Sequence, residues 1–162
     1  MDINQLLHQV ILPVLDYLEL PKPEAAAELL LGTAIQESQA GHYIKQLGNG
    51  PALGIYQMEP ATHDDIWTNY LAYHGTLANM VERLRGTWPT KQQSLIYNLA
   101  YSTAMCRIHY YRVPAPLPLL GDLPAQAAYW KAHYNTRLGK GTTEEYIAAV
   151  GPALPDSVPK PT

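Results

Sequence analysis

The residues with the clearest chemical potential are one glutamate and a short motif that follows it. Glu37 lies where an apolar helical pattern ends, and Gly-Ile-Tyr-Gln-Met follows at residues 54–58 after a glycine-rich segment. Apolar residues that precede Glu37, such as Leu31 and Ile35, would bury one helix face and desolvate its carboxyl group. Desolvation raises the pKa of a carboxyl group, which can then donate a proton to a glycosidic oxygen near neutral pH. The pattern predicts acid catalysis on a sugar chain, and the plain alternative is a solvated glutamate at a helix end.

A single helical domain must position these residues. The chain has 162 residues, of which 47% are hydrophobic and 15% charged, and this composition fits one core. Apolar residues recur at helical spacing along most of the chain, which predicts a mainly α fold. We expect one domain over residues 1–150. Residues 151–162 hold four prolines and little to bury, so we expect an extended or mobile Pro-rich tail there.

Prolines, glycines and capping residues divide this domain into helices. Pro23 and Pro60 suit a first helical turn, whereas Pro13 threatens to kink or break the first helix. Thr142, with a glutamate three residues later, predicts a capping box. Residues 39–58 hold too many breakers for a helix and predict a loop that could include a short hairpin. The expected helices cover residues 3–18, 23–38, 60–71, 77–84, 91–112, 124–135 and 143–150.

Charge and hydropathy exclude several classes of partner. The net charge is −3 and the 11 Lys and Arg residues are scattered, so no nucleic-acid partner is expected. No stretch approaches the roughly 18 consecutive apolar residues of a membrane span. The N-terminus has no basic region followed by a solid apolar run, so we expect no signal peptide and no membrane span.

Neither a metal nor a cofactor is indicated. The six histidines are dispersed, with no HExxH pair and no paired cysteines. Phosphoryl transfer, dinucleotide chemistry and serine hydrolysis lack support, because P-loop, GxGxxG and GxSxG motifs are absent. Cys106 falls in an apolar helical run, which favours an inert core thiol over a reactive one.

Two motifs in sequence carry a family resemblance. Ile-Gln-Glu-Ser at residues 35–38, followed by Gly-Ile-Tyr-Gln-Met-Glu-Pro-Ala-Thr at residues 54–62, resembles the lytic transglycosylase and goose-type lysozyme superfamily. Members of that superfamily carry a catalytic Glu-Ser pair and then a Gly-Leu-Met-Gln type motif that runs into Pro-Ala-Thr. The match covers residues 29–65 with the right order and spacing.

Two further segments resemble the same proteins less closely. The third family motif, Ala-Tyr-Asn-Ala-Gly, is partly kept at residues 100–104, where Ser102 and Ala104 replace the usual Asn and Gly. Residues 129–141 resemble the endings of small lysozyme-like proteins of tailed bacteriophages. The resemblance implies a lysozyme-like fold, a helical bundle with a short loop or β-hairpin region between the Glu-Ser and Gly-x-x-Gln motifs.

The resemblance also implies roles for individual residues. Glu37 would be the general acid of a muramidase that cleaves the β-1,4 bond between N-acetylmuramic acid and N-acetylglucosamine. Substrate binding would fall to five residues, which are Ser38, Gly54, Tyr56, Gln57 and Tyr101.

Each of these five residues has a definite expectation and most have an alternative. Ser38 would orient the site or bind substrate, or only end the helix, and Gly54 would let the backbone approach the sugar. Gln57 would hydrogen-bond the substrate or bridge the loop. Tyr56 would stack on a sugar face or simply pack. Tyr101 would lie near the catalytic glutamate and hydrogen-bond it or the sugar, or be an ordinary core tyrosine.

The nucleophile is harder to assign than the acid. Glu59, Asp64 and Asp65 follow the second motif, but the two aspartates suit the first turn of a helix. Lytic transglycosylases, as the resemblance implies, use one glutamate because the muramyl 6-hydroxyl attacks in place of water and gives a 1,6-anhydro product. This route is favoured over water hydrolysis by a lysozyme-like enzyme.

The location follows from the substrate and the missing export signal. Peptidoglycan lies outside the cytoplasmic membrane, so a phage protein is expected, with glycan strands and other virion or tail proteins as partners. It would be a virion component, or an endolysin that leaves the host cytoplasm for the periplasm and cell wall. Two other hypotheses remain: a catalytically weak structural virion protein with the same fold, and a non-catalytic glycan-binding module.

Overall fold

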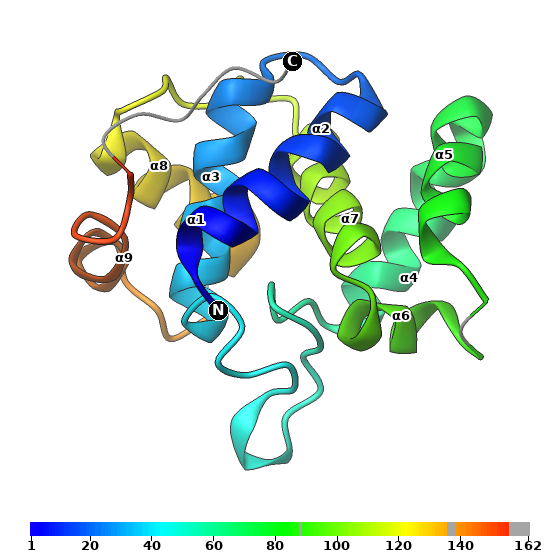
Figure 1. Cartoon of the computed structure of the whole chain (residues 1–162), viewed down its shortest axis with the longest axis horizontal. Coiled ribbons are helices and arrows are strands. Elements are labelled where there is room, and N and C mark those ends of the chain that lie inside the picture. The colour runs from blue at the N-terminus through cyan, green and yellow to red at the C-terminus, as the bar shows by residue number, and fades with distance from the viewer. Residues whose placement is uncertain (88, 136–138, 156–162) are drawn as a thin grey trace.

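Helices joined by loops make up the computed structural model, which describes residues 1–87, 89–135 and 139–155 (Figure 1). In chain order the helices are α1 (Ile3–Leu6), α2 (Leu12–Leu18), α3 (Pro23–Ser38), α4 (Pro60–Asn69), α5 (Gly75–Arg85), α6 (Lys91–Tyr97), α7 (Leu99–Tyr111), α8 (Leu123–Trp130) and α9 (Thr143–Val150). No named strand occurs over these described residues. The mainly α class is therefore confirmed, and the lysozyme-like arrangement stays a prediction.

Helix α3 lies in the core and ends at the Glu-Ser pair. Its residues from Ala26 to Ile35 are buried on all sides, because most of their side chains are small or apolar. The two polar exceptions are paired: Glu28 accepts a hydrogen bond from Gln126, and Thr33 donates to the Leu29 carbonyl. Helix α9 approaches α3 closely at Gly32, where a Cβ atom would lie 2.1 Å from the hydroxyl of Tyr146. In Figure 1, α8 and α9 lie on one side of α3, α1 crosses in front of it, and α2 continues toward α7.

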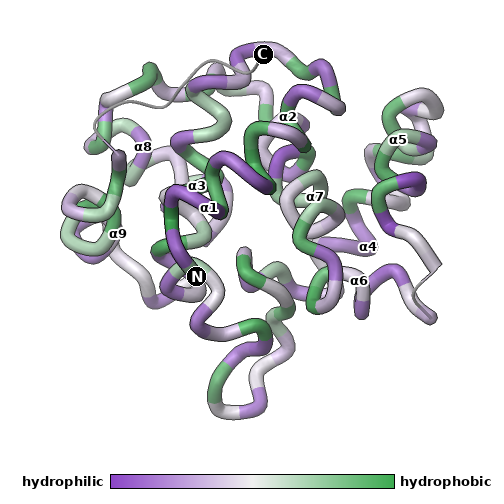
Figure 2. The backbone as a smooth tube through the Cα atoms, viewed as in Figure 1, coloured by the Kyte–Doolittle hydropathy of each residue, from purple (hydrophilic) through white to green (hydrophobic). Residues whose placement is uncertain are grey.

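Buried side chains form two clusters that share α7. Cys106 and Tyr110 of α7 belong to the cluster around α3, α8 and α9, whereas Tyr101 and Met105 belong to the cluster around α4 and α5. Hydrophobic colour accordingly recurs along α3 and α7 in Figure 2. No helix in the described ranges is both long and apolar enough to cross a membrane.

The first expected helix, residues 3–18, is interrupted before its proline. Residues 7–11 form a π-helical turn between α1 and α2, and Pro13 is the second residue of α2. A proline ring clashes with the carbonyl group four residues earlier and removes one N–H donor. The wider π-helical turn accommodates both effects, and the helical backbone continues through it into α2.

The long helix predicted over residues 91–112 is two helices, α6 and α7. Asn98 between them is extended, with φ −126° and ψ 102°. Its side-chain oxygen accepts a hydrogen bond from the Tyr101 N–H at 2.9 Å, and its amide group donates to the Leu84 carbonyl at 2.7 Å. Asn98 is thus an N-cap that starts a new helix, because its side chain competes with the helical backbone.

The segment between the two motifs is a loop without strands. Residues 39–58 contain only isolated bridges, between Lys45 and Leu53 and between Leu53 and Met58. A short 3-10 turn, Leu47–Asn49, forms the tip, and glycine and proline on either side limit regular pairing. The loop projects beyond the helices in Figure 1.

The start of the predicted tail belongs to the domain. The N–H groups of Ala153 and Leu154 both donate to the Val150 carbonyl at 3.0 Å, and both side chains pack against the core. The predicted capping box is confirmed, since Thr142 and Glu145 exchange hydrogen bonds at the start of α9. The rest of the tail, residues 156–162, lies outside the described residues.

Candidate active site

A cleft of about 800 Å³ opens beside the C-terminal end of α3. Four stretches of chain supply its walls: the end of α3, the loop that leads into α4 with the first turn of α4, His109 of α7, and the end of α8 with the segment that follows it. Glu37 of the first motif lines the cleft together with Gln57 and Glu59 of the second, so the structure brings residues of the two main motifs together. The cleft is of the size that holds part of an extended ligand.

Glu37 is held in the cleft as a partly buried carboxyl group. The indole Nε1–H of Trp130 donates a hydrogen bond to its Oε1 at 2.9 Å. Burial raises the pKa of Glu37 to about 7, although the hydrogen bond from Trp130 acts in the opposite direction. Near neutral pH a large share of the molecules therefore carries a protonated carboxylic acid, as the apolar helix pattern predicted.

Trp130 is placed by two elements that the sequence keeps far apart. It is the last residue of α8 and is buried, with its ring centroid 5.2 Å from that of Tyr146 on α9. The backbone passes close to the ring again at Gly141, where a Cβ atom would lie 2.6 Å from the indole. The ring is therefore fixed, and so is the N–H that it presents to Glu37.

Ser38 joins the end of α3 to the second motif. Its buried hydroxyl lies 2.5 Å from the carbonyl oxygen of Ile55 and accepts a hydrogen bond from the Gly41 N–H at 2.9 Å. Because the side chain is buried, its contacts are with the protein. Ser38 can orient the site by fixing the loop to the helix that carries Glu37.

Gly54 permits a close approach, but to the protein backbone. Its φ is +74°, and a Cβ atom there would lie 2.1 Å from the carbonyl oxygen of Leu95. Gly54 is buried against α6 and does not line the cleft, so the expected approach to a sugar is wrong. The physical reason for glycine is the left-handed turn packed against a helix.

Of the five expected substrate-binding residues, Gln57 is the one found among the described residues that line the cleft. Its backbone also has a positive φ, +46°, and its side-chain Nε2 donates to the Gly54 carbonyl at 2.8 Å. One of the two expectations for Gln57, a structural hydrogen bond within the loop, is therefore confirmed. The side chain still lines the same cleft as Glu37, where its amide oxygen can accept a further hydrogen bond.

Tyr56 packs in the core. Its side chain is fully buried, and its hydroxyl pairs with Thr103 Oγ1 at 3.1 Å. Its carbonyl oxygen accepts a hydrogen bond from the hydroxyl of Tyr134, which does line the cleft, at 2.7 Å. The expectation that Tyr56 stacks on a sugar face is wrong, and the packing alternative holds.

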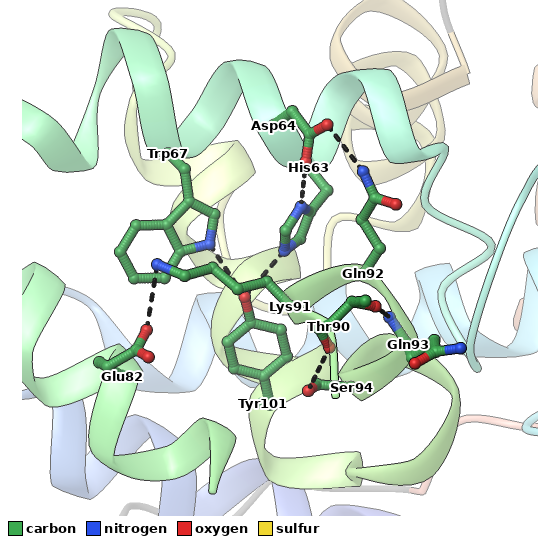
Figure 3. Close-up of polar contacts among 10 residues, drawn as sticks. All are labelled: His63, Asp64, Trp67, Glu82, Thr90, Lys91, Gln92, Gln93, Ser94 and Tyr101. Carbon is green, nitrogen blue, oxygen red and sulfur yellow. Dashed lines mark hydrogen bonds and ion pairs between the residues drawn. The ribbon is translucent and has the colours of Figure 1, made fainter. Parts of the chain in front are cut away.

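Tyr101 does not reach Glu37. It is fully buried, and its hydroxyl lies 2.8 Å from His63 Nε2 and accepts a hydrogen bond from Trp67 Nε1 at 2.9 Å (Figure 3). It does not line the cleft, so the expected contact with the acid or a sugar is wrong. The alternative of a core tyrosine with a satisfied hydroxyl holds.

The polar group around Tyr101 is a structural network between helices. His63 Nδ1 lies 2.8 Å from Asp64 Oδ1, and burial lowers the pKa of this histidine. A neutral His63 donates from Nδ1 to Asp64 and accepts the Tyr101 proton at Nε2, so every group has a partner. Figure 3 shows Lys91 of α6 reaching Glu82 of α5, with the two ions 3.2 Å apart. The network therefore joins α4, α5, α6 and α7.

The third motif meets the second through other residues than its tyrosine. Thr103 pairs with Tyr56, and Ser102 Oγ would lie 3.0 Å from a Cβ atom placed at Gly54. Both residues belong to α7, whose register turns Tyr101 toward α4 instead. The resemblance implies that Tyr101 meets the second motif. In the structure its neighbours Ser102 and Thr103 lie against that motif instead.

Sequence reasoning missed several residues of the cleft. His109, Asn135 and Lys140 line it together with Trp130 and Tyr134. His109 Nε2 lies 2.8 Å from the His133 carbonyl, and burial lowers its pKa to about 4. The only sequence signal was the mixture of aromatic and polar residues at 129–141, of which 136–138 lie outside the described residues.

Glu59 is the second carboxylate in the cleft. Its side chain is exposed and lines the same cleft as Glu37. Asp64 is bonded to His63 and Gln92, and Asp65 to Arg112 and Asn69. These two aspartates do not line the cleft. They are the fifth and sixth residues of α4, beyond its first turn, so the expected place in the first turn of a helix is wrong.

The described residues offer neither a metal site nor an exposed reactive thiol. No group of three or more His, Cys, Asp and Glu lies close enough there to hold a metal ion. Cys106 is buried, and burial raises the pKa of its thiol, which fits the predicted core thiol.

Protein-family models, curated proteins and solved structures were all compared with the chain, and none matches it.

Proposed function

We propose that the protein is a muramidase that cleaves the β-1,4 bond between N-acetylmuramic acid and N-acetylglucosamine, with Glu37 as the general acid. The observation that carries this proposal is a carboxyl group with a pKa of about 7 in an open cleft of about 800 Å³. A glycosidic oxygen needs a proton as its bond breaks, and a carboxyl group that titrates near neutral pH can supply it.

The hydrogen bond from Trp130 determines which carboxyl oxygen of Glu37 is free to donate a proton. The indole N–H occupies Oε1 of Glu37, which leaves Oε2 to carry the proton toward the glycosidic oxygen. After the transfer the carboxylate keeps the Trp130 hydrogen bond, which stabilises the charged form. Glu37 can then accept the proton of the attacking hydroxyl group, because its pKa lies close to the working pH.

The favoured attacking group is the 6-hydroxyl of the muramyl residue. This lytic transglycosylase route needs one carboxyl group and gives a 1,6-anhydro product. Hydrolysis is the alternative, and Glu59 is the carboxylate that could activate a water molecule, because it lines the same cleft. Mass spectrometry of digested peptidoglycan separates the two routes, since anhydro products are lighter by one water.

The test of activity is the clearing of purified peptidoglycan. The wild-type protein should reduce turbidity, and Glu37→Gln should not, because the amide cannot donate an acidic proton. Gln57→Ala is a matched cleft variant that should lower kcat/KM and keep the fold. Equal clearing by wild-type protein and Glu37→Gln would remove Glu37 from the mechanism.

A catalytically weak structural virion protein is the second candidate function. The altered third motif favours it, because Tyr101 is bound to His63 and Trp67 instead of completing the site at Glu37. No clearing by the wild-type protein across a range of pH and salt would support this candidate. Binding to the wall without release of soluble fragments would indicate a glycan-binding module.

The proposed setting is the bacterial cell wall during phage infection. Glycan strands would be the substrate, and other virion or tail proteins would be partners if the protein enters with the particle. An endolysin would instead reach the periplasm from the host cytoplasm. Mass spectrometry of purified virions would separate these routes by the presence of the protein.

A further inference from the structure

A second pocket lies at the opposite end of α3 from the cleft. Its volume is about 200 Å³, and it lies between the turn before α3, the end of α7 and the connector that follows. Prolines and tyrosines supply most of its wall, among them Pro21, Tyr111, Pro114 and Pro116. A helix of this length spans about 24 Å, so the pocket and the cleft are separate sites.

A buried arginine with unused donors lines this pocket. Arg107 is 1% exposed, and its Nη2 donates to the Pro21 carbonyl at 2.9 Å. Its Nε and Nη1 are buried without a hydrogen-bond partner. Such a cation is costly to bury, and a partner of opposite charge would remove much of that cost.

The free donors of Arg107 include a complete two-donor face. A guanidinium group offers one face through Nε and Nη2 and another through Nη1 and Nη2. Whichever hydrogen Nη2 gives to Pro21, its other hydrogen lies beside a free N–H on Nε or Nη1. A carboxylate matches such a face with two parallel hydrogen bonds.

No acidic side chain among the residues that line the pocket neutralises the charge of Arg107. The residues that line it include Lys22 and no Asp or Glu. The hydroxyl of Tyr129 donates to the Ala115 carbonyl at 2.9 Å, and the hydroxyl of Tyr110 pairs with Thr33. The centroid of the Tyr111 ring lies 5.1 Å from Cζ of Arg107, and this contact helps to hold the guanidinium group in place.

We propose that this pocket is a binding site for a carboxylate on a short aliphatic chain. Arg107 binds the carboxylate in bidentate fashion once the pocket wall yields over its buried donors. Lys22 adds a second positive charge at the rim, and the proline and tyrosine walls enclose the aliphatic part. The site is independent of the cleft and of the proposed muramidase activity. A free short-chain acid and the glutamate side chain of a partner protein share this chemistry.

Titration of the whole protein tests the site with defined probes. Sodium butyrate represents the free acid, and N-acetylglutamic acid α-amide represents a glutamate side chain. Their neutral counterparts are butyramide and N-acetylglutamine amide. The NMR signal of Arg107 Nε–H should shift in a saturable way with a carboxylate and stay unchanged with its amide. The tighter of the two carboxylates identifies the source of the ligand.

Two variants separate binding at the site from general anion effects. Arg107→Met should abolish the rise in Tm that a carboxylate causes, and Lys22→Gln should weaken binding several-fold. Lys22 is exposed, so this second variant tests the site even if Arg107→Met fails to fold. The proposal is overturned if neither carboxylate binds, if the amides bind equally well, if only inorganic phosphate binds, or if neither variant changes binding.

Discussion

Glu37 keeps its proton near neutral pH because burial disfavours the carboxylate more than the Trp130 hydrogen bond favours it. The same imbalance affects stability. The unfolded chain releases this proton at a pKa of about 4.5, and the folded protein does so at about 7. As the pH rises through this window the unfolded state is favoured, so a group poised for acid chemistry destabilises the protein at neutral pH.

Glu37→Gln is therefore expected to stabilise the protein at pH 8 by on the order of 3 kcal/mol. The glutamine has no charge to desolvate, and its side-chain oxygen can still accept the Trp130 hydrogen bond. At pH 4 the two proteins should have nearly equal stability, because both side chains are neutral there. Urea unfolding at both pH values measures the difference. A loss of stability at pH 8 would show that Glu37 is a structural residue.

Trp130→Phe is expected to raise the pKa of Glu37 further, because it removes the hydrogen bond that favours the carboxylate and keeps the ring. The carboxyl carbon signal of Glu37 in NMR reports this pKa without any substrate. If Glu37 is the general acid, the alkaline limb of the activity profile should move to higher pH, with a fall in kcat of about tenfold. An unchanged titration of Glu37 would contradict the assigned contact.

At the scale of elements, local signals predicted the helices well and contacts between them poorly. Pro23 and Pro60 begin α3 and α4, and Thr142 caps α9, as their types predict. Asn98 divides residues 91–112 into two helices through its hydrogen bonds to Leu84 and Tyr101. Leu84 lies on α5, outside this segment. Such a break depends on tertiary structure, so periodicity alone could not predict it.

Gly54→Ala is expected to destabilise the protein by more than about 3 kcal/mol, because the new methyl group would overlap the Leu95 carbonyl. Gly48→Ala is the matched control. Its φ is +71°, close to the +74° of Gly54, but no atom lies within 4 Å of its Cβ position. This control should lose only about 1 kcal/mol from the strained backbone. Equal losses of unfolding free energy would show that the contact with α6 is unimportant.

Tyr101→Phe is expected to reduce stability by about 2–3 kcal/mol and to leave the activity of the folded protein unchanged. The hydroxyl pairs with His63 and accepts from Trp67, so its removal leaves the buried His63 and the half-buried Trp67 without this partner. Denaturant unfolding gives the loss, and clearing of peptidoglycan below the transition gives the activity. A large fall in activity with normal stability would instead return Tyr101 to the catalytic site.

The whole molecule assembles the candidate site from stretches that no sequence pattern connects. Glu37 and Gln57 could be predicted, because each lies in a motif of the right order and spacing. Trp130 could not, since it lies 93 residues after Glu37 and is brought there by the packing of α8 and α9 on α3. His109 enters the cleft from α7 for the same reason. Long-range packing therefore supplies the residues that tune the acid.

Two titratable residues of the cleft, His109 and Glu37, change the stability of the whole protein with pH in opposite directions. His109 has a pKa of about 4 when folded and about 6.5 when unfolded, so its contribution to stability is complete above pH 6.5 and is lost toward pH 4. Glu37 acts in the opposite direction between pH 4.5 and 7, where acidification favours the folded state. From pH 6.5 to 4.5 each group changes the unfolding free energy by about 1.4 kcal/mol per pH unit, with opposite sign.

His109→Gln is expected to gain stability over the wild-type protein by about 2–3 kcal/mol as the pH falls from 6.5 to 4.5. Glu37→Gln should lose a similar amount relative to the wild type over the same range, because it lacks the opposing contribution. The double variant should have a pH dependence close to that of the wild type, since both contributions are absent. Urea unfolding at pH 4.5, 5.5 and 6.5 measures all four proteins. Parallel curves for His109→Gln and the wild-type protein would contradict the low pKa of His109.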